Sequence, residues 1–174
     1  QDEESIELFS RVAWRRVGAF VHLPAIGLDG QTHQMVPINP ADLDAALEKE
    51  TLTLNLELPL DAAAGFERAP KNDKEKAALA TTLKTLKDSA LFQPNAAAQC
   101  TVQSVQVSMP KFEGEHADID ANYVFRCTAP AELKGIETTL FKHFKRLYRI
   151  ETQRIGPTGQ GAQRLTPNKP VLRW

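Results

Sequence analysis

The sequence predicts an α+β fold, in which a largely antiparallel β-sheet carries two or three helices. Three observations lead to this prediction: runs of alternating apolar and polar residues, one helix with a complete start signal, and turn residues between the runs. We expect a sheet of five to seven strands with the helices segregated on it. The 174 residues contain no repeat and no linker long enough to divide them, so a single domain over residues 1–174 is expected.

The first half of the chain contains the clearest strand, at residues 51–58. Every second residue is leucine, and Pro59 ends the pattern. The leucines of this face are Leu52, Leu54, Leu56 and Leu58. Residues 16–23 alternate in a similar way and predict an earlier strand, followed by a loop rich in glycine and proline. Asn39 then has the character of a helix cap with proline at the first helical position, so a helix to about residue 49 is expected.

A longer helix is expected to start after Asn72. Asn72 can cap this helix, and Glu75 lies three residues later, where a capping box places its acidic residue. Apolar residues follow at helical spacing and form a stripe that fits against the leucine face of residues 51–58. This stripe consists of Leu79, Leu83, Leu86 and Ala90.

The last third of the chain predicts a short helix and several strands. Residues 130–144 have the pattern of a turn and a helix, and residues 146–155 that of a strand; shorter strands are expected at 162–165 and 171–173. The expected buried residues of the helical segment are Leu133, Ile136, Leu140 and Phe144. The glycines of residues 156–161 lack the spacing of a phosphate-binding or dinucleotide-binding loop, so they predict a tight turn.

The only two cysteines, Cys100 and Cys127, stand at the ends of two expected strands joined by a turn. They allow a single intramolecular disulfide, whose loop of 26 intervening residues predicts a stabilisation of about 3.5 kcal/mol. Such a bond indicates an oxidising compartment, outside the cell or in the periplasm. The alternative is a pair of buried free thiols in a cytosolic protein, whereas a metal site would lack the usual C-x-x-C spacing.

The second strand of this pair carries the candidate site. Its apolar residues alternate with His116, Asp118 and Asp120, which therefore share one face about 7 Å apart. Imidazole and carboxylate groups suit zinc, and a complete site needs three or four ligands. His22, on the polar face of residues 16–23, is the best further candidate. The alternative interpretation is a hydrated strand end rich in acidic residues.

Composition and motifs exclude several classes of function. The net charge of −1 gives no footprint for nucleic acid, and no apolar run is long enough to span a membrane. There is no G-x-S-x-G motif and no assignable nucleophile–base pair, so we do not expect an enzyme. The chain starts at Gln1 without a signal peptide, as a processed or trimmed protein would.

A collinear series of motifs runs from Leu54 to the C-terminal part of the chain. The motifs are L-x-L-E-L-P (54–59), G-F-E-x-A-P-K (65–71), D-K-E-K-A-A (73–78), L-x-x-L-K-D-x-A-L-F (83–92), A-A-x-C-T-V (97–102), H-x-D-x-x-A-x-Y-x-F-x-C (116–127) and P-x-G-Q-G-A-x-x-L-T-P-x-x-P (157–170). In this series the chain resembles the ZrgA-type periplasmic zinc-uptake proteins of Gram-negative bacteria. The G-A-F-V-H of residues 18–22 is similar to that family's G-A-H-V-H, with Phe20 in place of a histidine.

The resemblance implies export to the periplasm, zinc binding and work beside a metal-importing ABC transporter rather than catalysis, and it supports the disulfide. Residues 51–174 then form the family-like core, and residues 1–50 an N-terminal strand followed by an insertion at 24–50. Carried over position by position, the metal candidates are His22, His116, Asp118 and Asp120. The chain departs from the family in two further places.

The first departure is the connection between the two cysteine-bearing strands, where family members carry a long loop rich in histidine and acidic residues. This chain has only P-K-F-E-G-E-H there. The second is Arg68, which stands where the family's G-F-E-H motif has histidine. The resemblance therefore allows two functions: zinc binding for uptake, or a metal-free module of the same scaffold that docks to an envelope or transporter partner.

Overall fold

The computed structural model describes residues 39–112 and 117–174, which belong to the unit Ile38–Trp174 of the chain. The expected strand at 16–23 and most of the expected insertion at 24–50 lie outside the described residues. For the same reason, a single domain over residues 1–174 stays a prediction. The described residues form two β-sheets and three α-helices, so the expected α+β class is confirmed.

The larger sheet has six strands and carries the candidate site. In spatial order they are β4 (Cys100–Val107), β5 (Asp118–Cys127), β2 (Thr51–Pro59), β1 (Ala41–Glu48), β7 (Ile150–Gly156) and β8 (Gly159–Leu165). All neighbouring pairs are antiparallel except β1 and β7. The prediction of a largely antiparallel sheet of five to seven strands is therefore confirmed.

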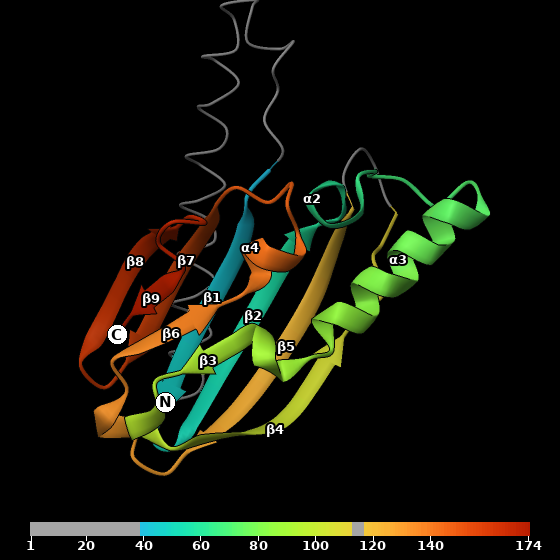
Figure 1. Cartoon of the computed structure of the whole chain (residues 1–174). Coiled ribbons are helices and arrows are strands. Elements are labelled where there is room, and N and C mark those ends of the chain that lie inside the picture. The colour runs from blue at the N-terminus through green and yellow to red at the C-terminus, as the bar shows by residue number, and fades with distance from the viewer. Residues whose placement is uncertain (1–38, 113–116) are drawn as a thin grey trace, which may run out of the picture. The chain divides into compact units, whose positions relative to one another are not determined.

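A smaller sheet and the helices cover one face of the larger sheet (Figure 1). The smaller sheet consists of β3 (Phe92–Pro94), β6 (Gly135–Thr138) and β9 (Val171–Arg173). The α-helices are α2 (Leu60–Ala64), α3 (Asp73–Leu86) and α4 (Leu140–His143), with 3₁₀ turns at Ser89–Leu91, Ala96–Ala98 and Pro130–Glu132. None of these helices has the length and apolar character that crossing a membrane requires.

The helix predicted after Asn39 is wrong, because residues 41–48 form the central strand β1. Alanine, leucine and a proline behind a cap residue favour a helix locally. However, the apolar residues of this segment recur at every second position, and all four are buried against the core. They are Ala41, Leu43, Ala45 and Leu47. Pairing with both β2 and β7 outweighs the local preference.

The turn between β1 and β2 explains why no hairpin was predicted there. Glu48 lies opposite Thr51, so only Lys49 and Glu50 connect the strands. Lys49 has a φ of 55°, as the first position of such a turn requires. Glycine or asparagine usually fills that position, and the Lys-Glu pair gave no turn signal.

Helix α3 begins as predicted, since the side chain of Asn72 accepts a hydrogen bond of 2.8 Å from the backbone N–H of Glu75. The helix ends earlier than the predicted stripe, at Leu86. Leu79 and Leu86 are buried and Leu83 is half-buried, but Ala90 is exposed in the turn that follows. The stripe is thus confirmed over its helical part alone.

The segment after Cys127 is part strand and part helix. Residues 135–138, predicted as helix, form β6, and the helix is the single turn α4. The predicted buried set of this segment, which is Leu133, Ile136, Leu140 and Phe144, is confirmed. The glycines of residues 156–161 belong to the β7–β8 hairpin, as a tight turn predicts. Gly159 has a φ of 121°, which favours glycine.

The predicted disulfide is present between Cys100 and Cys127. The two residues are paired at one end of the β4–β5 ladder, so the bond closes the open end of that antiparallel pair. The disulfide therefore lies at one end of β5, and the candidate residues Asp118 and Asp120 lie at the other end.

Tyr123 of β5 joins three parts of the fold. Its ring packs edge-on against Phe92 of β3, with the ring centroids 4.9 Å apart. Its hydroxyl donates a hydrogen bond of 2.5 Å to the backbone carbonyl of Leu86, the last residue of α3. Carbonyl groups at helix ends have no partner within the helix, so this hydroxyl satisfies one of them. Burial raises the pKa of the Tyr123 hydroxyl, and Asp88 acts in the same direction.

Replacing Tyr123 by phenylalanine should lower the free energy of unfolding by about 1–3 kcal/mol, because the buried Leu86 carbonyl loses its donor. Urea denaturation followed by circular dichroism measures this change. The matched control is Tyr148→Phe, since Tyr148 is 37% exposed. Equal effects of the two substitutions would contradict the role assigned to Tyr123.

Reduction of the Cys100–Cys127 disulfide should destabilise the protein by about 3.5 kcal/mol, because the unfolded chain regains the freedom that the closed loop removes. Denaturation curves with and without dithiothreitol measure the difference. A variant with both cysteines replaced by alanine is the control and should not respond to the reductant. An unchanged midpoint on reduction of the unmutated protein would disprove this contribution.

Candidate metal-binding site

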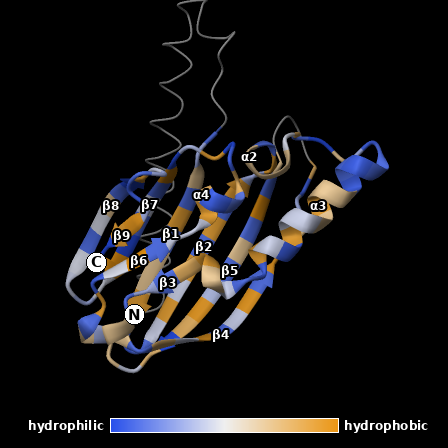
Figure 2. Ribbon diagram, viewed as in Figure 1, coloured by the Kyte–Doolittle hydropathy of each residue, from blue (hydrophilic) through white to orange (hydrophobic). Residues whose placement is uncertain are grey.

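The candidate site begins with Asp118 and Asp120 at the start of β5. Burial alternates along this strand: Ile119 and Ala121 face the core, Asp118 is half-buried and Asp120 is exposed. A matching alternation of hydrophobic and more hydrophilic residues along β2 and β5 is visible in Figure 2. The two aspartates therefore share the polar face of the larger sheet, as their spacing predicts.

The strand register adds carboxylates that sequence reasoning missed. Glu57 of β2 is paired with Asp120, Asp42 of β1 is paired with Glu57, and Glu151 of β7 is paired with Asp42. Paired residues share a face, so these four acidic residues form one row across four adjacent strands, about 4.8 Å from strand to strand. We call these four residues the carboxylate row.

The members of the row differ in their surroundings. Glu151 is held by two arginines, with its carboxylate 2.8 Å from Nε of Arg149 and 3.2 Å from Nε of Arg164. The Arg149 Nε is buried and makes no well-aligned hydrogen bond, so this contact is an ion pair alone. Asp42 and Glu57 each take part in a further polar or electrostatic interaction, as does Asp118 outside the row.

The titration of Asp120 is displaced from that of a free aspartate. Although the Asp120 side chain is exposed, the protein atoms around it partly desolvate its carboxyl and raise the pKa above the usual value, and the positive charge of Lys111 opposes that shift. Further along the same face, the side chains of Asn55 and Asn122 are hydrogen-bonded to each other. On β5 and β2 the polar face thus continues beyond the row as uncharged amides, whereas β1 carries a further carboxylate, Asp44, opposite Asn55.

The described residues do not contain a complete metal site. No three His, Cys, Asp or Glu side chains of residues 39–112 and 117–174 lie where they could hold one ion. Of the predicted ligands, Asp118 and Asp120 are placed on one face, whereas His22 and His116 lie outside the described residues. That these four side chains converge on one ion stays a prediction.

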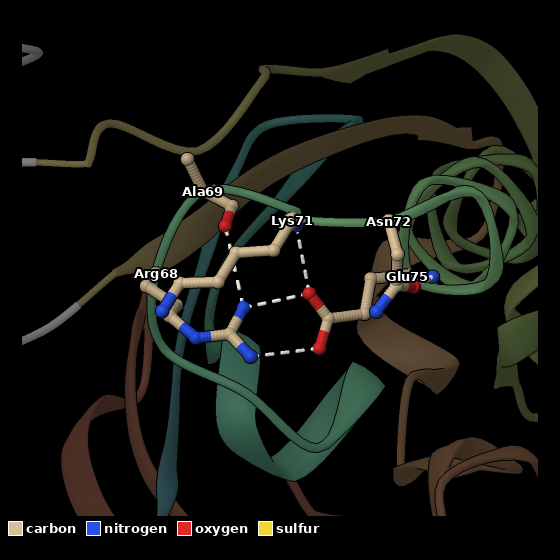
Figure 3. Close-up of polar contacts among 5 residues, drawn as sticks. All are labelled: Arg68, Ala69, Lys71, Asn72 and Glu75. Atoms are coloured by element: carbon tan, nitrogen blue, oxygen red, sulfur yellow. Dashed lines mark hydrogen bonds and ion pairs between the residues drawn. The ribbon is translucent and has the colours of Figure 1, made fainter.

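Arg68, the residue in place of a histidine, lies in the loop between α2 and α3 and is bound to Glu75. Its guanidinium donates to both carboxylate oxygens of Glu75, at 2.6 and 2.8 Å (Figure 3). The same carboxylate accepts the backbone N–H of Lys71 at 2.8 Å, and the guanidinium lies 5.6 Å from the centroid of the Phe66 ring. A positive side chain paired in this way adds no metal ligand at this position.

This network also modifies the predicted capping box. Asn72 accepts from Glu75 as expected, but the Glu75 carboxylate binds Arg68 and Lys71. The bidentate contact with Arg68 and the Lys71 N–H lower the pKa of Glu75 to about 2. The network fixes the loop before α3 to the first turn of that helix.

The three missed residues of the row had different signals in the sequence. Glu57 lies on the polar face of the strand predicted at 51–58, but only the register places it beside Asp120. Asp42 was hidden by the wrong helix prediction, although its neighbours Ala41 and Leu43 show the alternation of a strand. Glu151 depends on the parallel pairing of β1 and β7, which local sequence does not indicate.

Comparison with known proteins gives one family. A sequence model described as ZrgA family zinc uptake protein matches residues 39–174, which is most of the chain. No curated protein matches the chain. The match includes residues 39–50, the last part of the expected insertion at 24–50, and these residues contain the central strand β1.

The Arg68–Glu75 pair predicts a pH dependence of stability. The pKa of Glu75 is about 2 in the folded protein against 4.5 for the unperturbed group, so the stabilisation is present above pH 4.5 and is lost as the pH falls toward 2. Glu75→Gln should therefore have a lower free energy of unfolding than the unmutated protein at pH 6. This difference should disappear as the pH falls toward 2. Chemical denaturation across this range measures it.

A double-mutant cycle with Arg68→Met provides the control for this prediction. If the two side chains act as one pair, the double variant should lose little more stability at pH 6 than either single variant. Additive losses of stability in the double variant would contradict the pairing. A loss of stability in Glu75→Gln that is the same at every pH would contradict it as well.

Proposed function

Because the chain belongs to the ZrgA family of zinc uptake proteins, we propose that it is a periplasmic zinc-binding accessory protein that works with a metal-importing ABC transporter. The family match over residues 39–174 is the observation that carries this proposal. The disulfide agrees with it, since such bonds persist in oxidising compartments such as the periplasm. An uptake protein need not be an enzyme, and we propose no catalytic activity.

The proposed zinc ligands are His22, His116, Asp118 and Asp120. Support for the two aspartates comes from their common position on the polar face at the start of β5. His116 is two residues before Asp118, the spacing that keeps side chains of an extended segment on one face. Nitrogen and oxygen ligands of this kind suit Zn²⁺, with ligand distances of about 2 Å.

The carboxylate row supports the proposed site through its charge. Glu57 lies directly opposite Asp120 on the neighbouring strand, and Asp42 lies beyond it. Acidic residues concentrated on one face create a negative potential that raises the local concentration of cations. In the proposed mechanism the row attracts Zn²⁺ to the start of β5, and the ligands named above hold it there.

A second candidate function is a metal-free module of the same scaffold that docks to an envelope or transporter partner. Arg68 favours it, because a cation tied to Glu75 occupies a position where the resembled family has histidine. Thermal melting separates the two functions. Zinc should raise the midpoint of the metal-binding protein by linkage and leave that of a metal-free module unchanged.

Zinc titration by calorimetry tests the proposed ligands. His116→Ala should weaken binding at least tenfold, which is about 1.4 kcal/mol, because an imidazole ligand is removed. Asp120→Asn should also weaken zinc binding, since it removes a carboxylate charge. His143→Ala is the matched control, because His143 is an exposed histidine on α4.

The result that would end this proposal is an unmutated protein that binds no zinc above background in metal analysis and calorimetry. Zinc binding that His116→Ala and Asp120→Asn leave unchanged would retain the function but place the ligands elsewhere.

A further inference from the structure

The two outer strands of the larger sheet, β4 and β8, differ in how their open edges are protected. An edge strand presents unpaired N–H and C=O groups that can pair with another strand, and proteins usually block such edges with bulges, prolines or charged side chains. Strand β4 carries a register shift between Val102 and Ser104, which disrupts a regular edge. Strand β8 is paired with β7 without any register shift.

The register of the β7–β8 hairpin determines which backbone groups of β8 point outward. Gly156 is paired with Gly159 across a two-residue turn, so alternate residues from Gly159 onward exchange hydrogen bonds with β7. The N–H and C=O groups of the residues between them, Gln160, Ala162 and Arg164, therefore point away from the sheet. Within residues 39–112 and 117–174, no other backbone or side chain is hydrogen-bonded to these groups.

Among the described residues, the side chains of β8 do not block this edge. Its sequence, G-Q-G-A-Q-R-L, contains neither proline nor lysine, and three of its first four residues are glycine or alanine. The charged side chain, that of Arg164, turns back over its own sheet, with Nε 3.2 Å from the carboxylate of Glu151. Gln163 is likewise engaged on the opposite face, where its amide is hydrogen-bonded to the backbone of Val171 and Arg173 in β9.

From this edge we infer that a second copy of the chain pairs with β8, antiparallel and with Ala162 on the two-fold axis. In this register Ala162 lies opposite Ala162 of the second copy, and Gln160 lies opposite Arg164. Every outward N–H and C=O of the three edge residues then meets a partner. Like charges are not placed directly opposite each other, and the Glu151–Arg164 ion pair of each copy is kept.

The two larger sheets form one continuous sheet in this dimer, and β4 remains the outer strand of each copy. The interface is mainly main-chain hydrogen bonding with little apolar area, so the association is weak and depends on concentration. The proposed pairing involves only residues of β7, β8 and their neighbours, and it does not depend on zinc binding.

Sedimentation equilibrium of the full 174-residue chain, from micromolar to millimolar concentration, tests the inference. The mean mass should rise from 19.3 kDa toward twice that value. Ala162→Lys and Ala162→Glu should each remain monomeric, because each places like charges directly opposite at the axis. An equal mixture of the two variants should dimerise again, since lysine then lies opposite glutamate.

The matched control is Ser104→Lys on the opposite edge strand β4, which should dimerise like the unmutated protein. Ala162 and Ser104 are both exposed, so the substitutions should leave the fold intact, which circular dichroism checks. An unmutated chain that stays monomeric at millimolar concentration overturns the inference. It is also overturned if Ala162→Lys still dimerises, if the mixture of variants stays monomeric, or if Ser104→Lys abolishes the dimer.

Discussion

The leucines of β2 are 2% exposed or less, and they pack with the alternate residues of β1 and β5 against α3 and the smaller sheet. Because side chains of a strand alternate between two faces, burying this set forces every intervening residue onto the opposite face. Asp42, Glu57 and Asp120 lie there for this reason. A register slip of one residue would bury these carboxylates, so the apolar packing also fixes the position of the carboxylate row.

Sequence reasoning succeeded where local pattern and tertiary environment agree. The alternation at residues 51–58, the cap at Asn72 and the cysteine pair are each specified by residues close to the element they define. It failed at β1, where alanine and leucine favour a helix but two neighbouring strands impose an extended chain. It failed again at β6, a four-residue strand too short to show a period.

The candidate site was predictable only within one strand. The common face of Asp118 and Asp120 follows from their spacing, which sequence shows directly. Their proximity to Glu57 follows from the β2–β5 register, and that of Asp42 from a strand that was not recognised. Cross-strand neighbours are set by which strands pair and how they align, and a single sequence carries little information about either.

Gln163 attaches the smaller sheet to the larger one in an unusual way. Its side-chain amide accepts the N–H of Arg173 and donates to the carbonyl of Val171, as the backbone of an adjacent strand would. Backbone pairing tolerates almost any side chain, whereas this contact requires one donor and one acceptor on the same group. Deamidation to glutamate would place a carboxylate against the Val171 carbonyl, so chemical ageing at this one residue would loosen the C-terminal strand.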